Sequence, residues 1–129
     1  MNAFSVVLDT NILVSALLSP LGNPAKVYKM FLTGVLTLVY SADILTEYQD
    51  VLHRPQLGIP ADDADTVLAA IRQYGEQVEP VPSQVAMADE DDRVFYDTAK
   101  TAGAYLITGN MKHYPHEPFI MAPTKFLEL

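Results

Sequence analysis

The stretch FSVVLDTNILVSALL, residues 4–18, decides how this sequence folds. Its apolar run over residues 4–8 predicts a short buried strand, and residues 12–18 predict a first helix that ends before SPLGNP. Between them stands Asp9, followed at once by two more polar residues. A carboxylate beside a buried strand is costly unless it is paired, hydrogen-bonded or bound to a metal. Asp9 can cap the helix that follows it, or it can meet polar groups from elsewhere in the chain.

The composition limits the classes of protein to which the chain can belong. Its 129 residues predict one domain, residues 1–129, large enough to bury its own core. Half of the residues are hydrophobic and 19% are charged, an apolar surplus that favours a surface reserved for a partner or a second copy. The formal net charge of −8 excludes a large basic surface for grasping a polyanion.

The cysteine count and the N-terminal sequence predict where the protein acts. The chain has no cysteine, which excludes disulfides and thiolate metal sites and is typical of a reducing cytoplasm. The N-terminus lacks the basic residues and the apolar stretch of a signal peptide, and no apolar run is long enough to span a membrane. We therefore expect a soluble, cytoplasmic protein without a membrane partner.

Strand-like and helix-like segments alternate along the chain. Further strands are expected at VLTLVY (35–40), within EQVEPVP (76–82), at AYLITGN (104–110) and at FIMAP (119–123). Helices are expected over residues 24–33, 42–54, 62–74 and 89–102, with a last short helix from Pro123. This alternation indicates an α/β fold with a parallel sheet.

Four polar side chains are expected at one edge of that sheet. Asp9 ends the first strand, Asn110 follows the fourth, Glu47 lies in the helix after the second, and Asp92 lies in the first turn of the helix after the third. Ligands of parallel sheets bind beyond the carboxyl ends of the strands. On a helical wheel Asp91 borders the buried side as closely as Asp92 does, so geometry alone leaves that choice open.

A metal ion accounts for acids gathered in this way. Three clustered carboxylates repel one another in a partly dry pocket. Mg²⁺ or Mn²⁺ prefers carboxylate and carbonyl oxygens and relieves the repulsion. Such an ion lowers the pKa of a bound water and stabilises charge on a phosphate under attack. The residues therefore predict hydrolysis of a phosphodiester by a metal-activated water.

Four segments of the chain resemble PIN-domain ribonucleases, and within them the toxin component of bacterial type II toxin–antitoxin pairs. They are VVLDTNILVSALL, SADILTEYQDVLHRP, DEDDRVFYDTAKTAGAYLITGN and APTKFLEL. The resemblance implies a three-layer α/β/α sandwich with a short, mainly parallel central sheet. It also implies RNA cleavage with Mg²⁺ or Mn²⁺, a homodimer, and a basic antitoxin whose arginine could enter the acidic pocket.

The resemblance also implies roles for particular residues. The acids that hold the metal are Asp9, Glu47 and Asp92, and Asn110 stands where many members have aspartate. Because an amide is neutral, one metal ion is expected rather than two. Supporting positions in the same motifs are Asn11 and Thr108.

Further residues near these motifs have weaker predictions. Asp97 points away from Asp92 on the helical wheel and could contact the site only indirectly. The pair formed by His113 and His116 has no third ligand with the spacing of a zinc site. Candidate RNA contacts near the site are Lys112, His113 and Arg93.

Two other functions fit parts of the sequence. A PIN-like domain without activity would serve as a module that binds RNA or protein. A phosphatase would use Asp9 as its nucleophile, but such enzymes begin with Asp-x-Asp and this chain has Asn11 at the second acid position. The metal-dependent ribonuclease is the function that the sequence favours.

Overall fold

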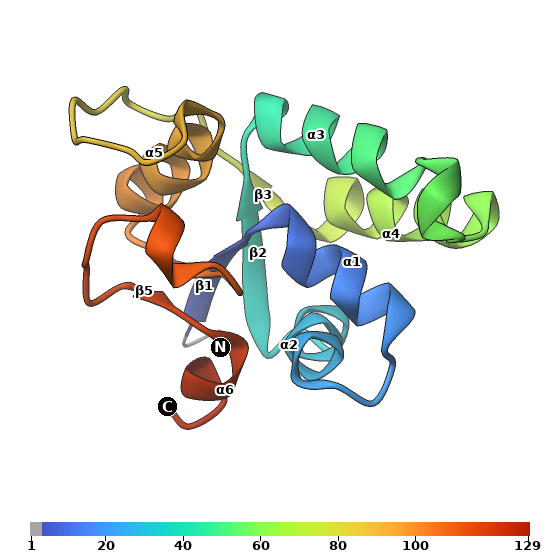
Figure 1. Cartoon of the computed structure of the whole chain (residues 1–129). Helices are drawn as coiled ribbons and strands as arrows, with labels where there is room; N and C mark the ends of the chain where they lie inside the picture. Colours follow the sequence, from blue (N-terminus) through green and yellow to red (C-terminus); the bar gives the residue numbers. More distant parts are fainter. Residues whose placement is uncertain (1–3) are drawn as a thin grey trace.

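The centre of the fold is a parallel sheet of five strands. The computed structural model describes residues 4–129 (Figure 1). The strand order is β3-β2-β1-β4-β5, and every neighbouring pair is parallel. The strands are β1 (Phe4–Leu8), β2 (Leu36–Tyr40), β3 (Glu76–Gln77), β4 (Tyr105–Ile107) and β5 (Ile120–Met121). The parallel α/β class expected from the alternating pattern is confirmed.

Helices connect the strands and follow the last one. The α-helices are α1 (Thr10–Leu18), α2 (Asn23–Leu32), α3 (Ala42–Leu52), α4 (Ala61–Tyr74), α5 (Arg93–Ala102) and α6 (Pro123–Phe126). The 3₁₀ helices are η1 (Pro55–Leu57), η2 (Glu90–Asp92) and η3 (Met111–His113). Over residues 4–129, no helix has the length and apolar character needed to cross a membrane.

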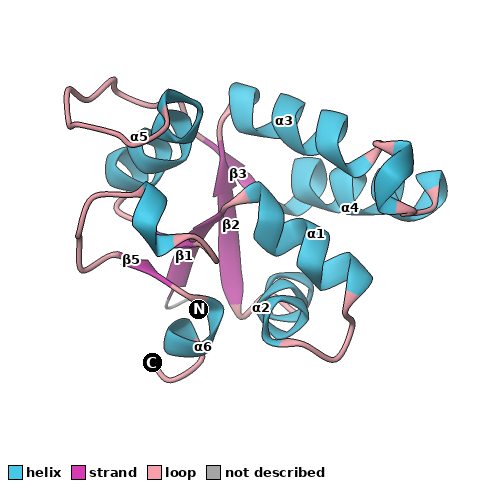
Figure 2. Cartoon of the chain, in the orientation of Figure 1, coloured by secondary structure: helices cyan, strands magenta, loops and turns pink. Residues whose placement is uncertain are grey.

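The helices lie in two layers, one on each side of the sheet (Figure 2). The chain adds β2 and β3 on one side of β1, then returns to add β4 and β5 on the other side. Crossover connections between parallel strands are right-handed. The connections that lead to β2 and β3 therefore cover one face of the sheet, and the connections that lead to β4 and β5 cover the opposite face. Accordingly α5 packs on β1, β2 and β4 from one face, while α1, α2 and α4 pack on β1 or β2 from the other (Figure 1). The result is the expected α/β/α sandwich.

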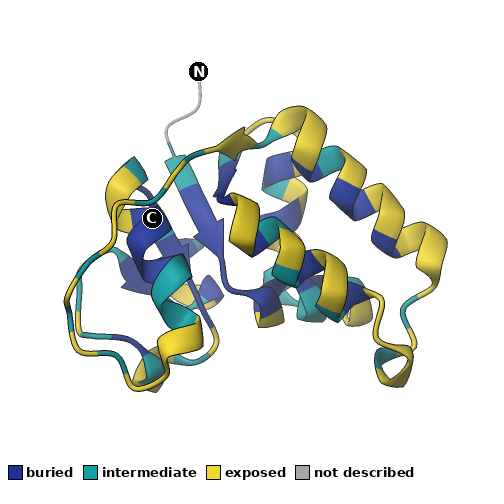
Figure 3. Ribbon diagram, turned by 90° about the horizontal axis from the view of Figure 1, so that it is seen from above, coloured by how far each residue is buried: buried dark blue, intermediate teal, exposed yellow. Residues whose placement is uncertain are grey.

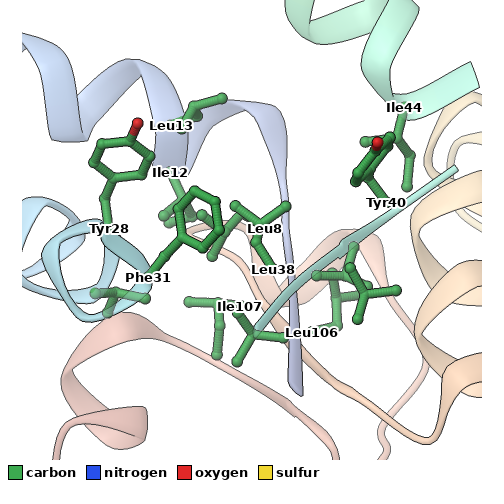
Figure 4. Close-up of a cluster of buried hydrophobic side chains, with 14 of the residues drawn as sticks. Leu8, Ile12, Leu13, Tyr28, Phe31, Leu38, Tyr40, Ile44, Leu106 and Ile107 are labelled. Carbon is green, nitrogen blue, oxygen red and sulfur yellow. The ribbon is translucent and has the colours of Figure 1, made fainter. Parts of the chain in front are cut away.

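The core is densest around the central strand. Val6, Val7 and Leu8 of β1 are all fully buried, and three consecutive residues can be so only if both faces of the strand are covered. On one face, Leu8 meets the buried side chains of Ile12 and Phe31 from α1 and α2 (Figure 4). The outer surfaces of the helices stay exposed while their inner surfaces are buried (Figure 3).

The start of the first helix differs from the sequence expectation, and the third strand is short. The first helix begins at Thr10 rather than at residue 12, so it starts directly after Asp9. The third strand, expected within residues 76–82, is limited to Glu76–Gln77. Pro80 and Pro82 have no N–H to donate to a sheet, and the Val81 N–H between them donates to the Thr101 hydroxyl of α5 at 2.9 Å. The chain therefore leaves the sheet early and lies along α5.

Candidate active site

Asp9 lies where the topology of the sheet reverses. The central strands β1 and β4 are neighbours, but their following connections turn to opposite faces, which opens a crevice at their carboxyl ends. The Asp9 N–H still donates to the Ile107 carbonyl at 3.0 Å, so the backbone fixes Asp9 at the end of the sheet. The sequence expectation that Asp9 occupies the carboxyl edge is met.

Asp9 is buried, with 7% of the residue exposed, and its carboxylate accepts from two hydroxyl groups. Its Oδ2 accepts hydrogen bonds from the Thr108 hydroxyl at 2.8 Å and from the Tyr114 hydroxyl at 3.2 Å. Asp9 occupies the N-cap position of α1 but makes no capping bond with its side chain. Within residues 4–129 its Oδ1 makes no hydrogen bond, so this oxygen is available to a ligand in the crevice.

Glu47 reaches the same crevice from α3. The helix starts at Ser41, whose hydroxyl accepts a hydrogen bond from the Ile44 N–H at 3.2 Å. Its buried stripe, Ile44, Tyr48 and Leu52, turns the neighbouring Glu47 to the edge of the core. There the Thr10 hydroxyl donates a hydrogen bond to the Glu47 carboxylate. The residue after Asp9 therefore connects two of the predicted acids.

Asp92 approaches from the opposite face, at the N-cap of α5. Its Oδ2 lies 3.1 Å from Nδ1 of His113, and its side chain is 17% exposed. Burial raises the pKa of the Asp92 carboxyl, the charge of Asp9 raises it further, and the bond to His113 opposes both effects. The Asp89 side chain accepts a hydrogen bond from the Asp91 N–H at 3.0 Å, which closes the turn that precedes Asp92.

These side chains line one cleft of about 680 Å³. The lining residues are Asp9, Thr10, Asn11, Asp43, Thr46, Glu47, Asp50, Val51, Arg54, Asp89, Asp91, Asp92, Asn110 and His113. Seven of them are acids, against one arginine, so the cleft is strongly negative. Its charge acts on the tyrosine beneath it, because the pKa of Tyr114 is raised by burial and then by the charges of Asp9, Asp92 and Glu47. The three predicted acids therefore line the same cleft.

Some predicted residues lie outside the cleft lining. Thr108 is fully buried behind it, where it holds Asp9. Lys112 is exposed beside it. The Arg93 guanidinium turns away and donates to the carbonyls of Ser83 and Val85 and to the Glu90 carboxylate. Asp97 is buried on the same side as Arg93, with the Ser83 N–H donating to its Oδ2 at 3.2 Å.

Arg93, Asp97 and Thr101 form one face of α5, which we call the loop-binding face. Their spacing of four residues stacks them along the helix. Arg93 donates to the carbonyls of Val85 and Ser83, Asp97 accepts from the Ser83 N–H, and Thr101 accepts from the Val81 N–H. Four residues of a helix rise about 6 Å, and two residues of extended chain span about the same distance, so the two sets of groups stay aligned. Because the residue numbers rise along α5 and fall along the segment, the segment lies antiparallel to the helix. This face fixes the loop that leads to Asp89 and Asp92.

Two residues of the site were not given a role from the sequence. Thr10 could have been noticed, because a hydroxyl directly after Asp9 is well placed to bond a neighbouring acid. Tyr114 had no such signal, since its position depends on the course of the irregular segment between β4 and β5.

Arg54, the one lysine or arginine in the lining, ion-pairs with Asp50 at 2.9 Å.

The donor chemistry of the cleft fits a hard divalent cation. Asp9 Oδ1, the Glu47 and Asp92 carboxylates and the Asn110 side-chain oxygen are the ligand types that Mg²⁺ and Mn²⁺ prefer. In the arrangement seen for residues 4–129, no three histidine or acidic side chains are close enough to hold one ion. Glu47 accepts a hydrogen bond from Thr10 and Asp92 contacts His113, so binding of one ion by all three acids would require their side chains to move.

Fold and site together define a class of protein, a parallel α/β domain with an acid-lined crevice at its switch point. Residues 5–112 match the family model of the PIN domain. The chain therefore belongs to the PIN-domain family, as the four sequence motifs indicated.

Two known proteins are similar to this chain. The uncharacterized protein MJ1680 of Methanocaldococcus jannaschii is 28% identical over 108 residues, which cover 81% of this chain and 70% of the relative. The crystal structure of VapBC2 from Rickettsia felis, bound to a DNA fragment from their promoter, contains a chain with a TM-score of 0.61 and 17% identity. That match covers 92% of this chain and 97% of the other. At this identity the likeness supports the fold.

Proposed function

We propose that this protein is a metal-dependent endoribonuclease, and that it is the toxin of a toxin–antitoxin pair. PIN domains are generally nucleases. The observation that carries the proposal is that Asp9, Glu47 and Asp92 come from three separate segments and line one cleft at the switch point of the sheet. Acids gathered there have no counterbalancing basic cluster, which favours a cation as their partner.

The residues that would hold Mg²⁺ or Mn²⁺ are Asp9, Glu47, Asp92 and Asn110. When bound, the ion lowers the pKa of a water and neutralises charge on the phosphate. Asn110 contributes no charge, so the site suits one ion better than two.

Other residues of the cleft would position the RNA. Arg54 is a residue of the lining, and His113 contacts Asp92. Lys112 lies next to them on the surface and is a candidate phosphate contact. Because the cleft carries seven acids, RNA affinity depends on the cation and falls as salt rises.

The partners follow from the same surface. A cleft with seven acids complements a basic protein, and an arginine of an antitoxin would form charge-assisted hydrogen bonds there. The similar solved structure is that of VapBC2 bound to a DNA fragment from their promoter. Exposed apolar side chains, including Leu21 in the turn between α1 and α2 and Leu32 at the end of α2, offer surface for a second copy in a homodimer. Action in the cytoplasm, where RNA and an antitoxin occur together, completes the proposal.

A binding module without catalysis is the second candidate. It is favoured by the spacing of the acids, since among residues 4–129 no three of them are close enough to hold an ion as they stand. In that case the cleft would bind a basic partner directly.

An RNA cleavage assay distinguishes these functions. Purified protein is incubated with single-stranded RNA, with Mg²⁺ or Mn²⁺ or with a chelator, alongside Asp9→Asn and Asp92→Asn. The matched control is Asp63→Asn, which removes the same charge from an exposed side chain of α4 outside the cleft. We expect metal-dependent cleavage that falls by about a hundredfold or more in both site variants and not in the control.

Each other outcome rejects a part of the proposal. RNA binding without turnover in any metal favours the module, and release of phosphate from a small phosphomonoester with intact RNA favours the phosphatase. The toxin role is tested by induced expression in bacterial cells, which we expect to arrest growth with the wild-type chain and not with Asp9→Asn. Normal growth, together with cleavage by the purified protein, would leave a nuclease that is not a toxin.

A further inference from the structure

Tyr114 places a buried hydroxyl group against the first acid of the site. It follows η3 in the connection between β4 and β5, and it is 6% exposed. Its hydroxyl donates to Asp9 Oδ2 at 3.2 Å, across 105 positions of sequence. The Thr108 hydroxyl donates to the same oxygen at 2.8 Å. Both donors therefore act on one of the two carboxylate oxygens.

We propose that Tyr114 is a positioning residue, whose hydroxyl orients the Asp9 carboxylate so that Oδ1 faces the cation. This inference rests on the proposed metal-dependent function. A carboxylate with one donor can still rotate about its Cβ–Cγ bond and present either oxygen. Two donors on Oδ2, the hydroxyls of Thr108 and Tyr114, define one rotation and leave Oδ1 to the cleft.

The connection that carries Tyr114 also reaches the other side of the site. His113, one residue earlier, contacts Asp92 at 3.1 Å, and Asn110 at the start of the segment has its side-chain nitrogen 3.4 Å from the His113 ring. The adjacent residues His113 and Tyr114 therefore contact Asp92 and Asp9, respectively. Through its bond to Asp9, Tyr114 anchors the segment next to the residue that contacts Asp92.

The hydroxyl is not needed to fill space. A phenylalanine ring would occupy nearly the same volume, so the oxygen is explained by its bond to Asp9. Tyr28 is a useful comparison, since it is 9% exposed and its hydroxyl has no hydrogen bond to any of residues 4–129. Tyr28→Phe removes the same atom from a buried ring outside the cleft lining, and it is the matched control.

The test is calorimetric titration of Mn²⁺ alone into the wild-type protein, Tyr114→Phe and Tyr28→Phe. Loss of a group that orients a metal ligand costs about tenfold or more in affinity. We expect Tyr114→Phe to bind Mn²⁺ about tenfold more weakly and Tyr28→Phe to match the wild type. Equal affinities in all three proteins would overturn the role of Tyr114. Absence of Mn²⁺ binding by the wild type would instead overturn the proposed function.

A second readout separates positioning from damage to the fold. At high Mn²⁺ the RNA cleavage rate of Tyr114→Phe should return toward that of the wild type, because excess metal compensates for weaker binding. A deficit that stays constant at every Mn²⁺ concentration would contradict positioning.

If Tyr114→Phe does not fold, the inference is tested on the wild-type protein by nuclear magnetic resonance. We then expect the hydroxyl proton resonance of Tyr114 to move during a Mg²⁺ titration with the same half-saturation as calorimetry. An unchanged resonance at saturating Mg²⁺ would reject the inference.

Discussion

Thr108 and Asp9 are 99 positions apart in the chain, and the hydroxyl of one donates to the carboxylate of the other at 2.8 Å. Both side chains are buried, and the strands that they follow are neighbours in the sheet. This bond connects the strand that ends in the first acid to the strand that leads to Asn110. It makes the geometry of the site depend directly on the pairing of β1 with β4.

Thr108→Val should destabilise the protein and weaken the site. The change keeps the shape of the side chain but leaves Asp9 Oδ2 with one donor, and removing one partner of a buried hydrogen bond costs about 1–3 kcal/mol. We expect a loss of that size in the free energy of unfolding measured with urea. Thr108→Ser keeps the hydroxyl, so its free energy of unfolding should be closer to that of the wild type than that of Thr108→Val is. Equal losses in the two variants would show that the methyl group, not the bond, matters.

Gly75→Ala should destabilise the end of α4. A Cβ at this position would lie 2.5 Å from the Ile71 carbonyl oxygen and 3.0 Å from that of Leu38, and both are backbone atoms that cannot turn away. Overpacking of this kind costs about 1–3 kcal/mol. Urea unfolding should show this loss, while Gly22→Ala, whose nearest contact is 3.4 Å, serves as control. Equal stability of Gly75→Ala and the wild type would contradict the tight approach of β2 to α4.

His53 should give the stability a pH dependence near neutrality. Its ring bonds the Gln49 carbonyl and the Asp65 carboxylate of α4, and these bonds raise its pKa above the usual 6.5. Because the folded state favours the protonated ring, this contribution is fully present below 6.5 and is lost as the pH rises through the raised pKa. Melting temperatures of the wild type and His53→Gln should therefore differ more at acidic pH than at alkaline pH. A constant difference across this range would contradict the assignment.

Arg93→Met should loosen the loop before the third acid. The guanidinium bonds the carbonyls of Ser83 and Val85, and methionine keeps most of the aliphatic packing but none of these bonds. Hydrogen exchange measured by mass spectrometry should then show faster exchange in peptides covering residues 81–85 and unchanged exchange in β1. Arg93→Lys should not rescue the loop, since one ammonium cannot reproduce a planar fork. Unchanged protection in Arg93→Met would show that the loop does not depend on the loop-binding face.

The sequence was sufficient to predict the fold and the acids that share a cleft. Asp9, Glu47 and Asp92 each follow a parallel strand, and topology brings such positions to one edge. The placement of Arg93 was not predictable in the same way. One residue along a helix rotates the side chain by about 100°, which turns Arg93 from the cleft of Asp92 toward the loop.

The remaining contacts depend on segments without regular structure. The Tyr114 hydroxyl reaches Asp9 because of the path of residues 108–119, for which no periodic pattern exists. The early end of the third strand has a similar origin, since Val81 and Ser83 bond to side chains of α5 and not to the sheet. Such side-chain-to-backbone hydrogen bonds depend on the tertiary arrangement, so the pattern of apolar residues in the sequence does not predict them.

The most direct measurement of the central claim is anomalous diffraction from crystals grown with Mn²⁺. The account predicts one Mn²⁺ peak in the cleft, bound by Asp9 Oδ1 and by the carboxylates of Glu47 and Asp92, with both acids turned away from Thr10 and His113. Crystals soaked in saturating Mn²⁺ that show no peak between these three acids, or a peak held by other residues, would contradict it.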